Sequence, residues 1–119
     1  MKRILDDNPI LRDIIEDFEK LINELIMKYR PISIIIGGSL AKSKFVRGLS
    51  DIDILIVTNY EISKYERFIL KAIKDIDIEI TVYSIHEIKN CLKDDDPFIN
   101  DTIRNGIEIY GNLRDYLKY

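Results

Sequence analysis

The chain has 119 residues, of which 46% are hydrophobic and 33% are charged, so we expect one folded domain spanning residues 1–119. The net charge of −3 excludes the basic field with which proteins hold nucleic acid non-specifically. A single cysteine, Cys91, excludes an internal disulfide and a cysteine-based zinc site. Charges at the N-terminus do not fit a signal peptide, and no apolar stretch approaches the ~20 residues of a membrane span, so we expect a cytoplasmic protein without a membrane partner.

The first half of the chain predicts a helix followed by two strands. Asn8 is a suitable N-cap, Pro9 suits the first helical position, and apolar residues then recur at helical spacing up to Tyr29. Residues 32–36 form a β-rich run that ends at two glycines, and residues 51–57 form a second, mostly apolar strand. Residues 40–49 connect the two strands with one or two helical turns.

The second half predicts a helix, a strand, two helices and a last strand. Ser63 and Glu66 fit a capping box that opens a helix through Ile73. The further elements are a strictly alternating strand over 77–83, a helix over 84–93 opened by a second capping box, a helix over 97–105, and a short strand over 107–110. This order predicts an α/β (α+β) fold in which a small mixed β-sheet is flanked by helices.

Two carboxylates at the start of the second strand are the strongest functional signal. Asp51 and Asp53 point to the same face, about 6.6 Å apart at a rise of about 3.3 Å per residue. At an effective dielectric near 20 their charges repel by roughly 2.5 kcal/mol. A solvated edge strand is the alternative reading, but residues 54–57 are too apolar for an exposed edge. The pair therefore predicts a bound cation, of which a divalent metal with oxygen ligands is the best candidate.

Two further features add to this signal. Gly37, Gly38 and Ser39 end the first strand, where glycines let the backbone approach a phosphate closely, although a plain tight turn is the alternative. Asp77 and Glu79 share one face of the alternating strand, where an acidic outer face is the alternative to a metal ligand. A phosphate loop together with three carboxylates is the apparatus of two-metal phosphoryl or nucleotidyl transfer.

A Walker A loop does not explain these residues. The dipeptide Lys42-Ser43 resembles the end of that motif, but the motif requires glycine where Ile36 and Ala41 stand. It also requires a long helix after Ser43, and the strand at Asp51 begins too soon for one.

The combined pattern resembles the signature of the DNA polymerase β-like nucleotidyltransferase superfamily. That signature is a Gly-Ser pair, here Gly38-Ser39, followed by a short helical turn and an Asp-x-Asp on the next strand, here Asp51 and Asp53. The match is nearest to the minimal nucleotidyltransferases, which are small prokaryotic catalytic domains often encoded beside a helical HEPN-domain partner. Residues 79–83 resemble the strand of the third carboxylate and residues 106–111 the terminal strand, so the resemblance covers nearly the whole chain. Ser43 departs from it, because the family usually has glycine there.

The resemblance implies a polymerase β palm-like fold and a set of site residues. It implies that Asp51, Asp53 and Glu79 are catalytic and bind two Mg²⁺ ions, which Mn²⁺ can replace, with Asp77 as the other candidate for the third carboxylate. Nucleotide binding is implied for the following residues: Gly38, Ser39, Lys42 and Ser50. Lys44 and Arg47 are further basic residues near the loop, for which a solvated surface position is favoured.

The implied reaction moves an NMP from an NTP, with ATP favoured, to a hydroxyl acceptor. The family analogy nominates a HEPN-type partner protein as acceptor, with this chain as the antitoxin. A second copy of the chain is another candidate partner. Two alternatives from other classes remain: a degenerate module that binds a nucleotide or a partner without turnover, and a self-associating scaffold without a ligand.

Overall fold

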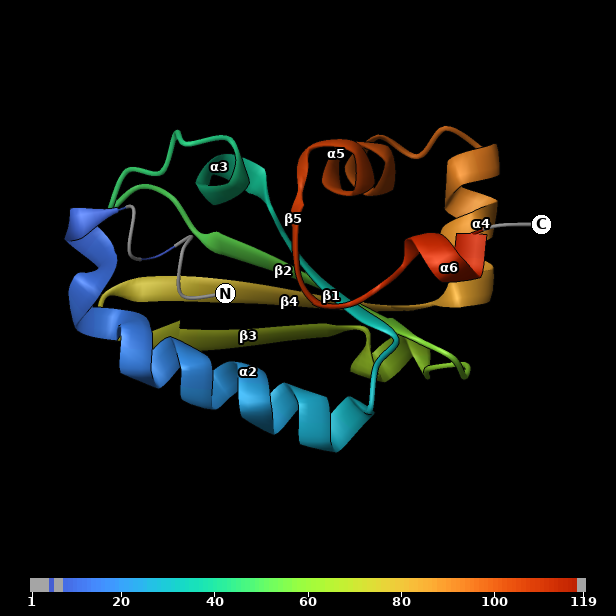
Figure 1. Ribbon diagram of the computed structural model, residues 1–119, viewed down its shortest axis with the longest axis horizontal. Helices are drawn as coiled ribbons and strands as arrows, with labels where there is room; N and C mark the ends of the chain where they lie inside the picture. Colours follow the sequence, from blue (N-terminus) through green and yellow to red (C-terminus); the bar gives the residue numbers. More distant parts are fainter. Residues whose placement is uncertain (1–4, 6–7, 118–119) are drawn as a thin grey trace.

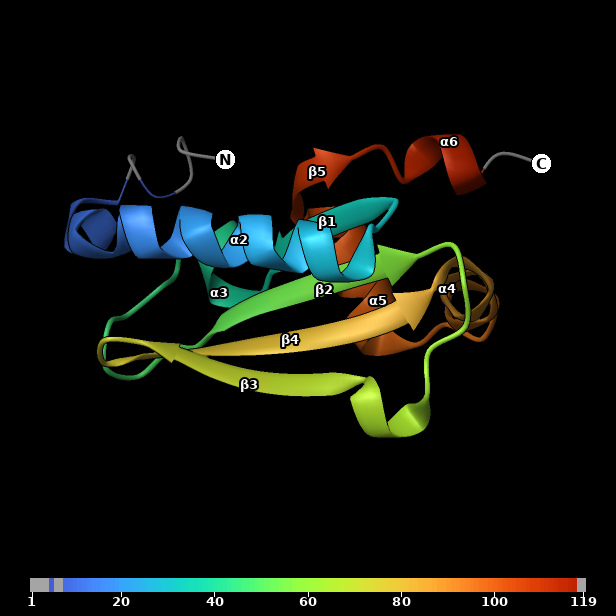
Figure 2. The same cartoon turned by 90° about the horizontal axis from the view of Figure 1, so that it is seen from below.

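Five strands form one mixed sheet in the order β3-β4-β2-β1-β5 in the computed structural model, which describes residue 5 and residues 8–117 (Figures 1 and 2). The strands are β1 (Ser33–Gly37), β2 (Ile52–Thr58), β3 (Phe68–Ile73), β4 (Ile76–Ser84) and β5 (Ile107–Gly111). Strand β1 runs antiparallel to β2 and β5, and β3 runs antiparallel to β4. Strands β2 and β4 are parallel neighbours. This arrangement confirms the α/β class with a small mixed sheet.

Strand β2 occupies the centre of the sheet, which explains its apolar sequence. Residues 54–58 are all buried, because helices cover both faces of a central strand. The solvated-edge alternative for residues 51–57 is therefore excluded.

Helices pack on both faces of the sheet (Figure 1). They are η1 (Pro9–Ile14), α2 (Ile15–Tyr29), α3 (Gly38–Ala41), η2 (Lys64–Glu66), α4 (Ile85–Lys93), α5 (Pro97–Asn105) and α6 (Arg114–Leu117). Helix α2 lies along one face, and α4 and α5 cover part of the other. No helix in the described part of the chain is both long enough and apolar enough to cross a bilayer.

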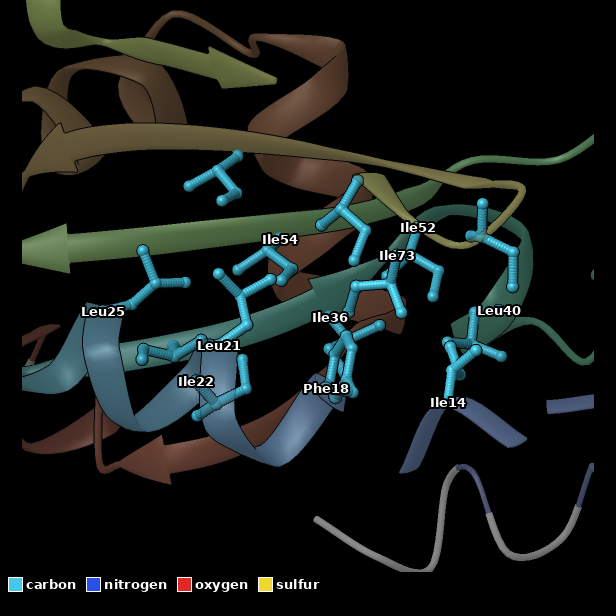
Figure 3. Close-up of a cluster of buried hydrophobic side chains, with 14 of the residues drawn as sticks. Ile14, Phe18, Leu21, Ile22, Leu25, Ile36, Leu40, Ile52, Ile54 and Ile73 are labelled. Atoms are coloured by element: carbon cyan, nitrogen blue, oxygen red, sulfur yellow. The ribbon is translucent and has the colours of Figure 1, made fainter. Parts of the chain in front are cut away.

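Alternation along the strands divides the core into two clusters. On the α2 side, Phe18 and Leu25 pack against Ile36 and Ile54 (Figure 3). On the other side, Leu55 and Val57 meet apolar residues of α4 and α5. Residues of β2 thus point alternately toward the two layers, as the period of two requires.

The expected helix over residues 63–73 is wrong. Ser63 does accept a hydrogen bond from the backbone N–H of Tyr65, but only the short 3₁₀ turn η2 follows. Residues 68–73 form β3, which turns back through Lys74 and Asp75 into β4 with Ile73 opposite Ile76. Pairing with β4 outweighs the local helical spacing, because each ladder bond satisfies backbone groups that the short helix would leave partly exposed.

The other predicted elements are present, and a short C-terminal helix, α6, was not predicted. The helix predicted over 9–29 is present, with its first six residues in 3₁₀ form. The second capping box is complete: Ser84 Oγ accepts the N–H of Glu87 at 3.1 Å, and Glu87 Oε1 accepts the N–H of Ser84 at 3.0 Å. Isoleucines 78 and 80 and Val82 are buried on the core face of β4, as the alternation predicts.

Candidate active site

Register across four strands places the candidate site residues on one line. Gly37 of β1 pairs with Asp53 of β2, Asp53 pairs with Glu79 of β4, and Glu79 pairs with Leu70 of β3. Paired residues of neighbouring strands point to the same face, so these side chains share the face that carries α4 and α5. Asp51 immediately precedes β2 and is exposed. The Asp pair and Glu79, predicted from separate motifs, are therefore neighbours.

Gly38 brings the backbone after β1 against the Asp pair. Its φ of +63° lies in the left-handed region, where a side chain is strained. A Cβ at this position would lie 2.1 Å from Oδ2 of Asp53, which is far inside van der Waals contact. Glycine is therefore required here twice, for its conformation and for the close approach. The tight turn proposed as an alternative does exist, but it lies against a carboxylate.

Burial and mutual proximity raise the pKa of two carboxyls. The pKa of Asp53 is raised mainly because the half-buried group loses water, and the charge of Asp51 raises it further. The pKa of Glu79 is raised by loss of water, and then by hydrogen bonding and charge from Asp53 and by Asp51. Each of these two carboxyls therefore influences the ionisation of the other. The site is thus an acidic centre that a cation would stabilise.

The donor set suits a hard divalent cation whose coordination the substrate completes. In residues 5 and 8–117, no three acidic, histidine or cysteine side chains converge as a preassembled metal cage. Mg²⁺ is usually held by one or two carboxylates together with substrate phosphates and waters, and not by such a cage. Asp51 and Asp53 beside the backbone of Gly38 fit that mode of binding.

The remaining predicted binding residues lie around the same loop. Lys42 follows α3, and its Nζ lies 2.9 Å from Oδ2 of Asp101 on α5. Ser50 accepts a hydrogen bond from the N–H of Val46 at 2.9 Å and so closes the turn before Asp51. Ser39 lies in α3 and is partly exposed. Lys42 and Ser50 therefore have structural partners within the chain.

Ser43 adopts the left-handed conformation that its place in the loop requires. Its φ is +58°, in the region that glycine adopts most readily. The loop forms, but a non-glycine residue in this region is strained by roughly 1–2 kcal/mol.

We expect Ser43→Gly to stabilise the protein by up to about 1 kcal/mol, because the relief of this strain exceeds the added entropy of glycine in the unfolded chain. Urea unfolding of the two proteins measures the difference. Gly48→Ala, at another left-handed position with open space around it, is the matched control and should destabilise the protein.

Arg47 anchors the loop that leads to Asp51, a role that the sequence did not predict. Its guanidinium lies 2.7 Å from a carboxylate oxygen of Asp13 and 2.6 Å from one of Asp75. It also donates to the backbone carbonyl of Ile10 at 2.6 Å. One side chain thus joins the loop to η1 and to the β3–β4 turn. The only signal in the sequence was a basic residue close to the Asp pair.

We expect Arg47→Leu to lower the melting temperature and to make the loop before Asp51 more accessible to protease, because two acidic groups lose their shared partner. Differential scanning calorimetry and limited proteolysis measure the two effects. Arg12→Leu, an exposed arginine of η1, is the control. Unchanged protease sensitivity would contradict the anchoring role.

Comparison with known protein families identifies a match that covers most of the chain. The family model described as nucleotidyltransferase domain matches residues 18–110, which include α3, both aspartates and Glu79. No curated protein matches the chain.

Proposed function

The chain belongs to the nucleotidyltransferase domain family, and from this premise we propose that it transfers an NMP from an NTP, preferentially ATP, to a hydroxyl acceptor. The observation that carries the proposal is the line of Gly37, Asp53 and Glu79 across three strands, with the backbone of Gly38 against Asp53. A phosphate that approached the backbone at Gly38 would lie beside the carboxylates that we propose as cation ligands.

Each residue has a role in this proposal. The backbone at Gly38 and the hydroxyl of Ser39 receive the triphosphate. Asp51 and Asp53 would hold Mg²⁺, and Glu79 would help to hold a second ion; when bound, these ions neutralise the negative charge of the phosphate oxygens. Lys42 would exchange Asp101 for a phosphate oxygen, and Ser50 would hold the turn before Asp51 in place.

The transfer step is a single displacement at the α-phosphorus. The acceptor oxygen forms a bond to this phosphorus, the bond to the α,β-bridging oxygen breaks, and pyrophosphate leaves with the electron pair. The acceptor hydroxyl releases its proton to the carboxylate of Glu79. Glu79 is the carboxylate that pairs with Asp53 in the register, so it lies beside any phosphate held there.

The acceptor that we propose is a partner protein of the HEPN type, which the chain would modify as its antitoxin. This step rests on the resemblance to minimal nucleotidyltransferases and on the net charge of −3, which disfavours a nucleic-acid acceptor. The competing function is nucleotide binding without turnover. Ser43, a non-glycine residue at a left-handed position of the phosphate loop, favours that alternative.

Calorimetry with Mg²⁺-ATP, followed by a transfer assay with α-labelled ATP, separates these functions. Binding together with transfer of label to a partner supports the enzyme. Binding without transfer to any acceptor supports the degenerate module. Absence of ATP binding would exclude both the enzyme and the nucleotide-binding module, and the self-associating scaffold would remain.

A further inference from the structure

A hollow beside Glu79 has an apolar lining that the catalytic roles do not use. It has a volume of about 580 Å³ and lies between β3, β4 and the start of α5. Its apolar walls are Phe68, Leu70, Tyr83 and Phe98. Three of these side chains are well exposed: Phe68 by 70%, Leu70 by 67% and Phe98 by 42%. Large apolar side chains gathered around one hollow indicate a binding surface.

The strand register places this hollow on the side of Glu79 opposite the phosphate loop. Leu70 pairs with Glu79 on the line that begins at Gly37, and Phe68 pairs with Thr81 one step further along β4. Across the face, the order is therefore phosphate loop, Asp53, Glu79 and apolar hollow. Figure 2 shows the strands β1, β2, β4 and β3 in this order.

The geometry of in-line displacement indicates from which side the acceptor approaches. The attacking and leaving oxygens lie on opposite sides of the phosphorus. If pyrophosphate leaves toward Gly38, the hydroxyl arrives from the opposite side, past Glu79. That side is the hollow over β3 and β4.

The chemistry of the hollow selects the kind of acceptor. Glu79 and Asp96 supply acidic groups at its wall. The guanidinium of Arg67 stacks 4.3 Å from the ring centroid of Tyr83, which lines the hollow, and forms an ion pair with Glu87. A polyanion such as an RNA end is therefore repelled, whereas a neutral or basic apolar group is accepted. Strand β3 is also the edge of the sheet, so its outer backbone groups can pair with an extended segment.

We propose that this hollow binds an extended, apolar and non-acidic polypeptide segment that presents the acceptor hydroxyl on one of its side chains to Glu79. The inference rests on the proposed function for the identity of the reaction. The surface itself is defined by Phe68, Leu70 and Phe98, none of which belongs to the phosphate site.

Peptide binding tests the hollow without requiring turnover. The probe is a fluorescein-labelled, capped octapeptide of leucines and lysines with one central serine or tyrosine, titrated by fluorescence anisotropy in Mg²⁺-ATP. We expect Leu70→Ser combined with Phe98→Ser to weaken binding by about tenfold, or ~1.4 kcal/mol. Both side chains are exposed, so circular dichroism should be unchanged. Met27→Ser, at a residue 76% exposed on α2, is the matched control and should bind as the wild type does.

Mg²⁺-ATP affinity is measured by calorimetry on the same proteins and should be equal in all of them. A peptide affinity that the double variant leaves unchanged, absence of peptide binding by the wild type, or tighter binding of a fluorescein-labelled oligoadenylate than of the peptide in the same titration would each overturn the proposal. Failure of the wild type to bind ATP would instead refute the proposed function, because peptide binding to the hollow is measured separately.

Discussion

Asp53→Asn is expected to lower transfer by at least about 10³-fold, or ~4 kcal/mol, and Asp51→Asn should have a similar effect. Asp53 lies between Gly38 and Glu79, so its charge is central to any phosphate held there. A neutral amide keeps the shape of the side chain but cannot offset the charge of a cation. Single-turnover assays with α-labelled ATP measure the loss.

The same substitution should not destabilise the metal-free protein. The pKa of Asp53 is raised in the fold, chiefly by burial and then by Asp51. The folded state therefore keeps a proton that the unfolded chain, with an ordinary value of 3.8, has already lost. Stability from this group is full below pH 3.8 and is lost as the pH rises through the raised pKa. An asparagine does not ionise, so Asp53→Asn should not lose stability in this way as the pH rises.

Thermal melts in EDTA between about pH 4 and pH 8 test the sign. The wild type should lose more stability over this range than Asp53→Asn does, and added Mg²⁺ should stabilise only the wild type strongly. Asp77→Asn, on the same face of the sheet but outside the line of paired residues, is the control. A clear fall in the melting temperature of both Asp51→Asn and Asp53→Asn at pH 7 would show that these carboxylates are structural.

Local sequence patterns predicted most of the fold because, in most segments, they favour the same secondary structure that the packing of the folded chain requires. The alternation in β4 and the capping box at Ser84 have the same meaning in isolation and in the folded chain. The helix prediction for residues 68–73 was wrong because the apolar residues of this segment fit both helical and strand spacing. These residues are Phe68, Ile69, Ala72 and Ile73. Only the partner strand β4, at the other side of a two-residue turn, decides between helix and strand.

The sequence predicted which residues form the candidate site, but it did not predict how these residues are arranged in space. The period of two placed Asp51 and Asp53 on one face, whereas their distance from Glu79 depends on the parallel pairing of β2 with β4. The roles of Arg47 and of the hollow depend on residues far apart in the chain, such as Asp13 and Phe98. No local pattern carries such information.

Glu79→Gln is expected to remove transfer while retaining weak Mg²⁺-ATP binding, whereas Asp77→Asn should cost at most about tenfold, or ~1.4 kcal/mol. Glu79 pairs with Asp53 in the register, so the two carboxyls are neighbours. Asp77 pairs with Ala72, one step further from Asp53 along β4. A glutamine cannot accept the acceptor's proton or balance a cation, but it leaves Asp51 and Asp53 in place to hold the nucleotide.

Both variants should be assayed side by side, with the candidate partner as acceptor and calorimetry for nucleotide binding. Equal circular dichroism spectra would exclude misfolding, which is not expected because both side chains are exposed. Measuring transfer against pH adds a second readout: Asp77→Asn should keep the acid limb of the wild-type profile, because the proposed proton acceptor is Glu79. An inactive Asp77→Asn beside an active Glu79→Gln would reverse the two roles and move the third carboxylate toward the β3–β4 turn.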